Sequence, residues 1–473
     1  MKFKKFTTEM LDKVNLFVLR EIGRVIGVKA PAAKNKDDLI KEIIAVQNGE
    51  MQPAPPSNLG APQKTKVDLS AFLETDGDDV EYPFELANPK IELRDSQKPS
   101  NITVEGVLEV HANGYGFLRV NNYENSKEDA YVSTINIKKY NLRRGDRVKA
   151  ICTPPKETEA AALKQVLSIN DLDPALFLKR TNFDDLIPYY PTKRLKLENA
   201  TNADDVAIRC IDLFAPIGKG QRGLIVAPPK AGKTTLLKKI AQAIESNYPD
   251  VKLIILLIDE RPEEVTDIKR SVKGEVVFST FDENAEHHIR AAELVINRAK
   301  RLVEVGQDVV ILMDSITRLA RAYNNTIDSS GKTLSGGLDP AALNGPKRFF
   351  GAARNIEDGG SLTVLSTALI ETGSRLDDVI YEEFKGTGNM EIHLSRELSE
   401  KRIFPAIDLY KSGTRKDELL LSEKELATVY KLRKILSERS DATDTLIEMM
   451  KKSKNNDDLI SKIDVWMQLY RKG

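Results

Sequence analysis

One short segment of the chain has the residues needed to hold the phosphates of a nucleotide. The segment is Gly223-Leu-Ile-Val-Ala-Pro-Pro-Lys-Ala-Gly-Lys-Thr-Thr-Leu-Leu237, which joins an apolar strand to a predicted helix. Phosphate loops follow the pattern Gly, four residues, Gly-Lys-Ser/Thr, and their backbone N–H groups and the dipole of the next helix face the phosphates. Ala227 replaces the first glycine of that pattern. The segment predicts a nucleoside triphosphatase, and the alternative is a strand-to-helix turn that binds nothing.

The residues of this loop have different predicted roles. Gly232 allows close approach of the backbone, Lys233 is expected to contact the β- and γ-phosphates during catalysis, and the Thr234 hydroxyl group is expected to bind Mg²⁺. The predicted nucleotide-binding residues of the loop are Lys230, Ala231, Gly232, Lys233, Thr234 and Thr235.

Hydrolysis also requires carboxylates and a cation near the γ-phosphate. The apolar run Val309–Met313 ends in Asp314, and another apolar run ends in the acidic segment 259–264. Ligands of open α/β sheets bind at the carboxyl ends of the strands, so Asp314 is a predicted Mg²⁺ ligand and Glu260 is predicted to activate water. The acids of segment 259–264 could instead only cap the next helix. Arginine is too abundant for the pattern alone to select the cation.

The composition excludes several classes of protein. The 473 residues are enough for two to four domains. The 71 basic and 71 acidic residues balance, so any nucleic-acid site must be local. Cys152 and Cys210 are too few for a metal cluster or a disulfide framework, which predicts a cytoplasmic location. No apolar run approaches the ~20 residues that span a bilayer, so no membrane partner is expected.

Changes in composition divide the chain into six parts. Residues 1–50 are predicted to form a small helical domain, and residues 51–102 a proline-rich and acidic linker. Five short apolar segments at 103–170 predict a small β-barrel. After a connector at 171–199, residues 200–420 alternate strands and helices, which predicts a mostly parallel sheet covered on both faces. Residues 421–473 are predicted to add amphipathic helices to that domain.

The predicted barrel carries two aromatic side chains at alternate positions of one strand. Tyr115 and Phe117 are expected on the same face, together with Arg119. Adjacent rings can stack on nucleic-acid bases, although a small barrel also needs aromatic residues in its core. Positive charge for phosphates is expected from Lys138, Lys139, Arg143, Arg144 and Arg147.

Five motifs together closely resemble the Rho family of bacterial transcription termination factors, over residues 103–420. They are Gln221–Thr234, Asp259-Glu-Arg-Pro-Glu-Glu-Val-Thr266, Met313-Asp-Ser-Ile-Thr-Arg-Leu-Ala-Arg-Ala-Tyr323, Pro346-Lys-Arg-Phe-Phe-Gly-Ala-Ala-Arg354 and Tyr381-Glu-Glu-Phe-Lys-Gly-Thr-Gly-Asn-Met390. The resemblance implies a cold-shock-like OB-fold barrel and a RecA-type ATPase that forms hexameric rings. Phosphate loops of this family also have alanine at the position of Ala227.

The resemblance also assigns residues that the pattern alone left open. Arg415, in Ser412-Gly-Thr-Arg415, matches the catalytic arginine finger that enters the neighbouring subunit's site. Phe404 matches the residue that packs on adenine. Arg261, Arg318 and Arg402 match residues that couple the γ-phosphate to the subunit interface.

For RNA, the resemblance implies one site on the barrel and a second in the channel of the ring. The RNA-binding residues predicted in this way are Tyr115, Phe117, Arg119, Tyr131, Glu159, Lys332 and Arg375. The barrel segment Pro154–Ala162 lacks the aromatic residue that the family often has near Ala161, which predicts an altered second base subsite. On composition alone, the glycine-rich segment around Lys332 would be only a linker.

The function predicted from these observations is an RNA-dependent ATPase that uses ATP and Mg²⁺. The resemblance implies a homohexamer that binds nascent single-stranded RNA, translocates 5′ to 3′ as a helicase, and releases transcripts from the RNA polymerase elongation complex. A rotary ATP synthase catalytic subunit shares the sheet and the phosphate loop but should lack the Gly-Tyr-Gly-Phe barrel. A non-catalytic RNA-binding module would leave residues 200–420 unexplained.

Overall fold

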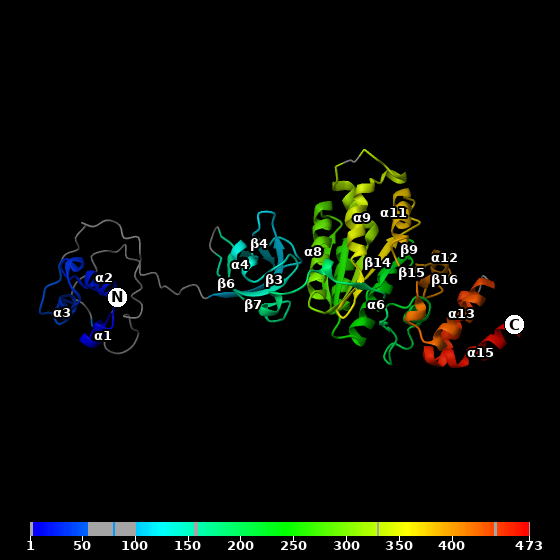
Figure 1. The fold of residues 1–473 in the computed structure, drawn as a ribbon, viewed down its shortest axis with the longest axis horizontal. Helices are drawn as coiled ribbons and strands as arrows, with labels where there is room; N and C mark the ends of the chain where they lie inside the picture. The colour runs from blue at the N-terminus through cyan, green and yellow to red at the C-terminus, as the bar shows by residue number, and fades with distance from the viewer. Residues whose placement is uncertain are drawn as a thin grey trace. The chain divides into compact units, whose positions relative to one another are not determined.

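The computed structural model describes residues 3–54, 79–80, 101–155, 159–328, 331–438 and 442–472. The chain forms two units, Met1–Ser100 and Asn101–Gly473, and Figure 1 shows the elements of each. Most of the predicted linker at 51–102 lies outside the described residues, as do residues 156–158 of the barrel.

The first unit is helical, as predicted. It contains α1 (Thr8–Asp12), α2 (Leu16–Ile26) and α3 (Lys36–Gln47), with a two-stranded pair of β1 (Phe3–Lys4) and β2 (Asp79–Val80). Leu11, Leu39 and Ile43 are fully buried in its core. An apolar stripe from Met10 to Val18 is interrupted because Asn15 accepts a hydrogen bond from Val18 N and starts a new helix. Phe17, which belongs to this sequence stripe, therefore faces solvent.

The second unit begins with the predicted five-stranded barrel, which is confirmed. Its strands close in the order β3-β4-β5-β7-β6. The elements of the barrel are β3 (Ile102–Val110), β4 (Gly116–Arg119), β5 (Ala130–Val132), α4 (Thr134–Lys139), β6 (Arg147–Thr153) and β7 (Ala161–Ile169). Gly116 is required where β4 pairs closely with β3, because a Cβ atom there would lie 2.5 Å from the Glu109 carbonyl oxygen.

The main sheet has nine strands, and its central path runs β11-β10-β12-β14-β9-β15-β16. The strands are β8 (Pro188–Tyr189), β9 (Arg222–Ala227), β10 (Lys252–Glu260), β11 (Glu275–Thr280), β12 (Asp308–Asp314), β13 (Arg354–Ile356), β14 (Ser361–Leu369), β15 (Met390–Leu394) and β16 (Ile407–Thr414). Neighbouring strands from β11 to β15 pair in parallel, whereas β16 is antiparallel to β15. The predicted mostly parallel sheet is therefore confirmed.

Helices cover both faces of this sheet, because alternate residues of its central strands enter two separate cores. Ile255 and Leu257 of β10 pack in the same core as α6, while Leu256 and Ile258 pack in the core that contains α8. The helices are α5 (Val206–Phe214), α6 (Lys233–Asn247), α7 (Pro262–Ser271), α8 (Ala285–Val303), α9 (Ile316–Thr326), α10 (Asn344–Gly351), α11 (Arg375–Lys385) and α12 (Arg396–Glu400).

The described part of residues 421–473 forms three helices, as predicted. They are α13 (Glu423–Glu438), α14 (Ala442–Lys452) and α15 (Asn456–Lys472), drawn in orange and red in Figure 1. Arg209 of α5 is fully buried and donates hydrogen bonds to the carbonyl groups of Met450 and Ser453. These bonds pair carbonyl groups that the C-terminus of α14 would otherwise leave without a donor. Among the described residues, no helix is both long enough and apolar enough to cross a membrane.

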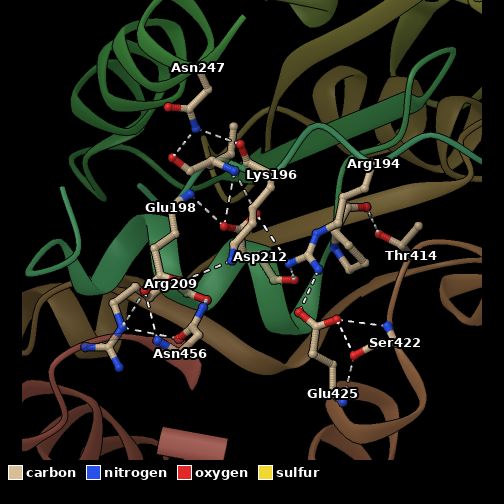
Figure 2. A network of polar contacts seen from close by, with 12 residues as sticks. Arg194, Lys196, Glu198, Arg209, Asp212, Asn247, Thr414, Ser422, Glu425 and Asn456 are labelled. Atoms are coloured by element: carbon tan, nitrogen blue, oxygen red, sulfur yellow. Dashed lines mark hydrogen bonds and ion pairs between the residues drawn. The ribbon is translucent and has the colours of Figure 1, made fainter. Parts of the chain in front are cut away.

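A buried polar network fixes the connector to α5 and to the C-terminal helices (Figure 2). Asp212 of α5 accepts hydrogen bonds from Leu197 N at 3.0 Å and Glu198 N at 2.7 Å. Arg194 of the connector lies 2.7 Å from Glu425 of α13 and donates to the Asp212 carbonyl group. Burial raises the pKa of Asp212 despite the opposing effect of Arg194. The network joins segments that are more than two hundred residues apart in sequence.

The two cysteines give a first test of this packing. Burial raises the pKa of Cys152 to about 11 and that of Cys210 to about 12. At pH 8 roughly one Cys152 thiol in a thousand would be ionised, so we expect alkylation by iodoacetamide to be very slow in the folded protein and complete in guanidinium chloride. Mass spectrometry of the alkylated protein measures this difference. Fast modification of either thiol in the native protein would contradict the described core.

Candidate functional site

The phosphate loop lies between β9 and α6, where the predicted strand and helix are present. Lys230 has φ of 64° and Gly232 has φ of 91°, so the chain passes through two left-handed residues before α6 begins at Lys233. A Cβ atom on Gly232 would meet no other atom. Glycine is therefore required there by backbone conformation and not by space. This conformation leaves the N-terminus of α6, with its unpaired N–H groups, available to an anion.

Lys233 lies between two buried carboxylates from neighbouring strands. Its Nζ atom is 2.6 Å from Asp314 Oδ2 and 3.1 Å from Glu260 Oε2. Asp314 is 1% exposed and Glu260 is 2% exposed. Burial alone would lower the pKa of Lys233, but Asp314 and Glu260 outweigh burial and raise it. The site therefore holds a charged ammonium group and two acids at the carboxyl ends of β10 and β12.

Each of the two carboxylates has a further partner that fixes its orientation. Asp314 Oδ1 accepts a hydrogen bond from Thr367 Oγ1 of β14 at 2.7 Å. Glu260 Oε2 lies 3.5 Å from Arg318 Nη1 of α9. Thr367 lies inside a predicted strand but was not predicted as a site residue. Only the register that places β14 beside β12 could reveal it.

A β-bulge presents Glu260 to the site. The pairing of β10 with β11 shifts between Ile258 and Glu260, and Asp259 between them has φ of 55°. The extra residue turns the following side chain away from the alternation of the strand. Arg261 follows as the N-cap of α7 and is exposed.

The residues predicted to bind a divalent cation lie at or beside this loop. Thr234 Oγ1 donates to Glu264 Oε2 of α7 at 3.1 Å, and Asp314 contacts the neighbouring Lys233. Mg²⁺ prefers a few oxygen ligands from the protein together with phosphates and water. Thr234 and Asp314, the predicted ligands, are of the correct chemical type. Glu264 belongs to the acidic segment that was also considered as a helix cap.

Helix α12 contacts the phosphate loop, and the segment that follows it leads to β16. Ser399 Oγ donates to the carbonyl oxygen of Lys230 at 3.2 Å. Phe404 follows in the same segment and is 49% exposed, and Arg402 is exposed with φ of 60°. Because β16 starts at Ile407 beside the end of β15, this segment lies at the same sheet edge as the loop. An exposed ring near the loop can stack on a nucleotide base.

Arg415 lies at the opposite edge of the sheet. It follows Thr414, which pairs with Met390 of β15, and Met390 pairs with Gly223 at the start of β9. The start of the phosphate loop, at the end of β9, is roughly 13 Å from Thr414 along the strands and about 10 Å from it across them. Arg415 is exposed, and its backbone N–H is held by the Asn389 carbonyl group. Within one chain, the phosphate loop and this arginine are separate.

On the barrel, the predicted aromatic residues form one cluster with an additional ring. The ring centroids of Tyr115, Phe117 and Tyr131 lie 5.8 to 6.0 Å from one another. His111 stacks on Tyr115 with a centroid distance of 5.0 Å. His111 was not predicted, although its position at the end of β3, opposite the Tyr115 turn, is the signal that could have revealed it. These four residues are called the aromatic platform below.

Several cations of the barrel are paired within the protein. Arg119 is 7% exposed and its guanidinium group contacts both Glu109 and Asp129 at 2.7 Å. Arg143 and Arg144 lie 3.2 Å from Glu304 and 3.1 Å from Glu293, respectively, on the ATPase side of the unit. Their charges therefore help to dock the barrel, in contrast to the expectation that they face phosphates.

The structure brings two of the remaining predicted RNA-binding residues into neighbouring segments. Lys332 is exposed in the segment after α9, and Arg375 is the exposed first residue of α11. Gly336 of the first segment packs on the backbone of Arg375, since a Cβ atom there would lie 2.9 Å from the Arg375 carbonyl carbon. Glu159 is exposed on the barrel, beside the undescribed residues 156–158.

Comparisons with known proteins agree with this arrangement. The family described as the Rho termination factor RNA-binding domain matches residues 104–175. The family described as the ATP synthase alpha/beta family, nucleotide-binding domain, matches residues 207–414. The chain is 57% identical over 368 residues to transcription termination factor Rho of Bacillus subtilis (strain 168), covering 77% of this chain and 86% of that protein. It is 55% identical over 360 residues to transcription termination factor Rho of Escherichia coli (strain K12), covering 75% and 86%.

Among solved structures, the chain is similar to an ATPase from the type III secretion system of pathogenic bacteria. The TM-score is 0.50 with 23% identity, covering 64% of this chain and 94% of that one. This similarity shows the fold of the ATPase domain and, with the family matches, confirms the predicted fold class.

The hydrogen bond from Thr367 to Asp314 can be tested by substitution. Thr367→Val removes a donor to a buried carboxylate, an interaction of about 1.5 to 3 kcal/mol, so we expect nucleotide hydrolysis to fall by roughly 10- to 100-fold. Steady-state phosphate release measures this change. Thr363→Val is a matched control, because Thr363 lies on the same face of β14 but accepts from Gly220 N, away from Asp314. Equal rates in the two variants would contradict a role of Thr367 at the site.

Proposed function

The chain belongs to the Rho family of transcription termination factors, and from this premise we propose that it is a ring-forming ATPase whose hydrolysis of ATP depends on RNA. In this proposal it binds nascent single-stranded RNA on the barrel, translocates 5′ to 3′ with helicase activity, and releases transcripts from the RNA polymerase elongation complex. The observation that carries the proposal is the charged Lys233 between two buried acids, in the same folded unit as the aromatic platform.

Each residue of the phosphate site has a distinct role in this proposal. Lys233 neutralises charge on the β- and γ-phosphates and Glu260 orients and deprotonates the attacking water. Thr234 and Asp314 would hold Mg²⁺, which neutralises phosphate charge when it is bound. Thr367 keeps Asp314 in place through its hydrogen bond. Phe404 stacks on the adenine base, near the segment that contacts Lys230.

The position of Arg415 supports an assembly of several copies. A single chain places this arginine far from its own phosphate loop, at the amino end of the parallel strands. The transition state of phosphoryl transfer needs an additional cation, which an arginine from a neighbouring subunit can supply. We propose that Arg415 enters the site of the next subunit in a homohexamer, with Arg261, Arg318 and Arg402 near the interface.

RNA would contact two regions in this assembly. Bases stack on the aromatic platform with little sequence preference. Lys332 and Arg375, whose segments lie against each other, would hold the RNA backbone in the central channel. Glu159 would contribute at the edge of the barrel, where the usual aromatic residue is absent.

The match of residues 207–414 to the ATP synthase alpha/beta family keeps a rotary ATPase as the second candidate. The match of residues 104–175 to an RNA-binding domain favours the first. Comparing ATP hydrolysis with and without a cytosine-rich RNA distinguishes them. We expect strong stimulation by RNA, and equal rates without any polynucleotide would refute the proposal.

The role of Arg415 can be tested directly. Arg415→Ala should lower turnover by roughly 10³- to 10⁵-fold, because an arginine finger stabilises charge that develops only in the transition state. Nucleotide affinity, measured with a fluorescent ATP analogue, should change little. Lys411→Ala on the preceding strand β16 is the control, since Lys411 is exposed and its ion pair is with the nearby Asp408 of the same strand. Unchanged turnover in Arg415→Ala would reject the assignment.

The aromatic platform can be tested independently of hydrolysis. Phe117→Ala should cost about 1 to 3 kcal/mol of RNA-binding free energy, the contribution of one stacked base. Filter binding with a cytosine-rich oligonucleotide measures the loss, and ATP affinity should not change. Tyr430→Ala removes an exposed ring on α13 and serves as the control. Undiminished RNA binding by Phe117→Ala would count against the platform.

A further inference from the structure

A cluster of four charged residues connects the aromatic platform to helix α8 of the ATPase side. Arg119 of β4 contacts Glu109 and Asp129, each at 2.7 Å. Arg290 of α8 donates to Glu109 through Nε at 2.9 Å and through Nη2 at 2.7 Å. These residues, Glu109, Arg119, Asp129 and Arg290, are called the Glu109 clamp below.

The clamp lies directly beneath one ring of the platform. The Arg119 guanidinium carbon is 5.0 Å from the centre of the Phe117 ring. Because a cation at this distance is attracted to the face of the ring, the position of Arg119 influences the position of Phe117. Arg119 is 7% exposed and Asp129 is 3% exposed, so neither can move without leaving a buried charge unpaired.

Glu109 is the member that both arginines share. Burial would raise the pKa of Glu109, but hydrogen bonds from Arg290 and Arg119 outweigh burial and lower it. The carboxylate therefore remains charged between two guanidinium groups. If Arg290 is removed, Glu109 loses its bidentate partner and keeps Arg119 and the more distant Arg144, at 3.9 Å, which changes the charge balance that holds Arg119 under Phe117.

Arg290 differs from the other members because it comes from the ATPase side of the unit. Its helix α8 packs against β10 and β12, the strands that end at Glu260 and Asp314. We propose that Arg290 is a positioning residue for RNA binding, which orients Arg119 and Phe117 of the platform through Glu109. This proposal rests on the proposed RNA-binding function of the platform.

Two simpler roles of Arg290 must be distinguished from this one. It could dock the barrel on α8 as Glu293 does, whose carboxylate lies 3.1 Å from Arg144. It could also contact an RNA phosphate directly, since its side chain is 22% exposed. If Arg290 only docks the barrel, its substitution should weaken RNA binding to the same extent with and without Arg119. A phosphate contact should lower the slope of log affinity against log salt by about one.

The test is a double-mutant cycle in the full chain, with a cytosine-rich oligonucleotide as the probe. Arg290→Met should weaken RNA binding roughly tenfold in the wild-type background and have no further effect in Arg119→Met. The salt slope and the affinity for ATP should be unchanged. Arg290→Lys, which keeps the charge but not the bidentate geometry, should give an intermediate loss.

Glu293→Gln is the matched control, three residues further along the same helix. A loss in Arg290→Met that adds to that of Arg119→Met, or that equals the loss in Glu293→Gln, would show docking and overturn the proposal. A reduced salt slope, or unchanged binding, would also overturn it. If Phe117→Ala leaves binding unchanged, the platform itself fails. If Phe117→Ala weakens binding and Arg290→Met does not, only the role of Arg290 fails.

Discussion

The contact of Lys233 with Asp314 and Glu260 is the interaction on which the site depends. An isolated buried acid or lysine would lose its charge, because desolvation disfavours the ionised form. Here one ammonium group lies within 3.1 Å of two carboxylates, and the pKa of Lys233 is raised. The parallel register pairs Asp314 of β12 with Leu257 of β10, three residues before Glu260, so both acids lie at the carboxyl ends of neighbouring strands. The sheet therefore holds Lys233, Asp314 and Glu260 together. When a nucleotide binds, its phosphates can take the place of the carboxylates as partners of Lys233.

The same sheet keeps Arg415 away from the phosphate loop of its own chain. The phosphate loop, Glu260 and Asp314 lie at the carboxyl ends of the parallel strands, and Arg415 lies at the amino ends because β16 runs antiparallel. In the proposed ring, a protomer holds the nucleotide and Arg415 of the next subunit adds a further cation for the transition state. In the proposed ring, hydrolysis then depends on how two neighbouring subunits are placed, which is the property that a motor needs.

Features encoded within a few residues could be predicted from the sequence, and features that depend on strand register could not. The phosphate loop, the apolar strands before Glu260 and Asp314 and the barrel strands were predicted because spacing and alternation are local signals. Thr367 and Glu264 reach their partners only through the packing of segments that are distant in sequence, whereas His111 meets Tyr115 across a local turn. The predicted strands and helices at 200–420 and helices at 421–473 did not specify how β16 pairs with β15 or how α15 packs, because these positions depend on antiparallel pairing and on the C-terminal core.

Pairing of charges between domains explains how an overall neutral chain can carry a nucleic-acid site. Arginines that the sequence offers as phosphate ligands, such as Arg143 and Arg144, contact carboxylates of the ATPase side instead. These two arginines are used for docking, so stacking on the aromatic platform gains weight in the proposed RNA binding relative to counterion release. Stacking depends on ring geometry, and that geometry is sensitive to the ion pairs beneath Phe117. In the proposed role of the Glu109 clamp, α8 therefore influences the position of Phe117 in the aromatic platform. The same helix packs against β10 and β12, the strands that end at the hydrolysis site.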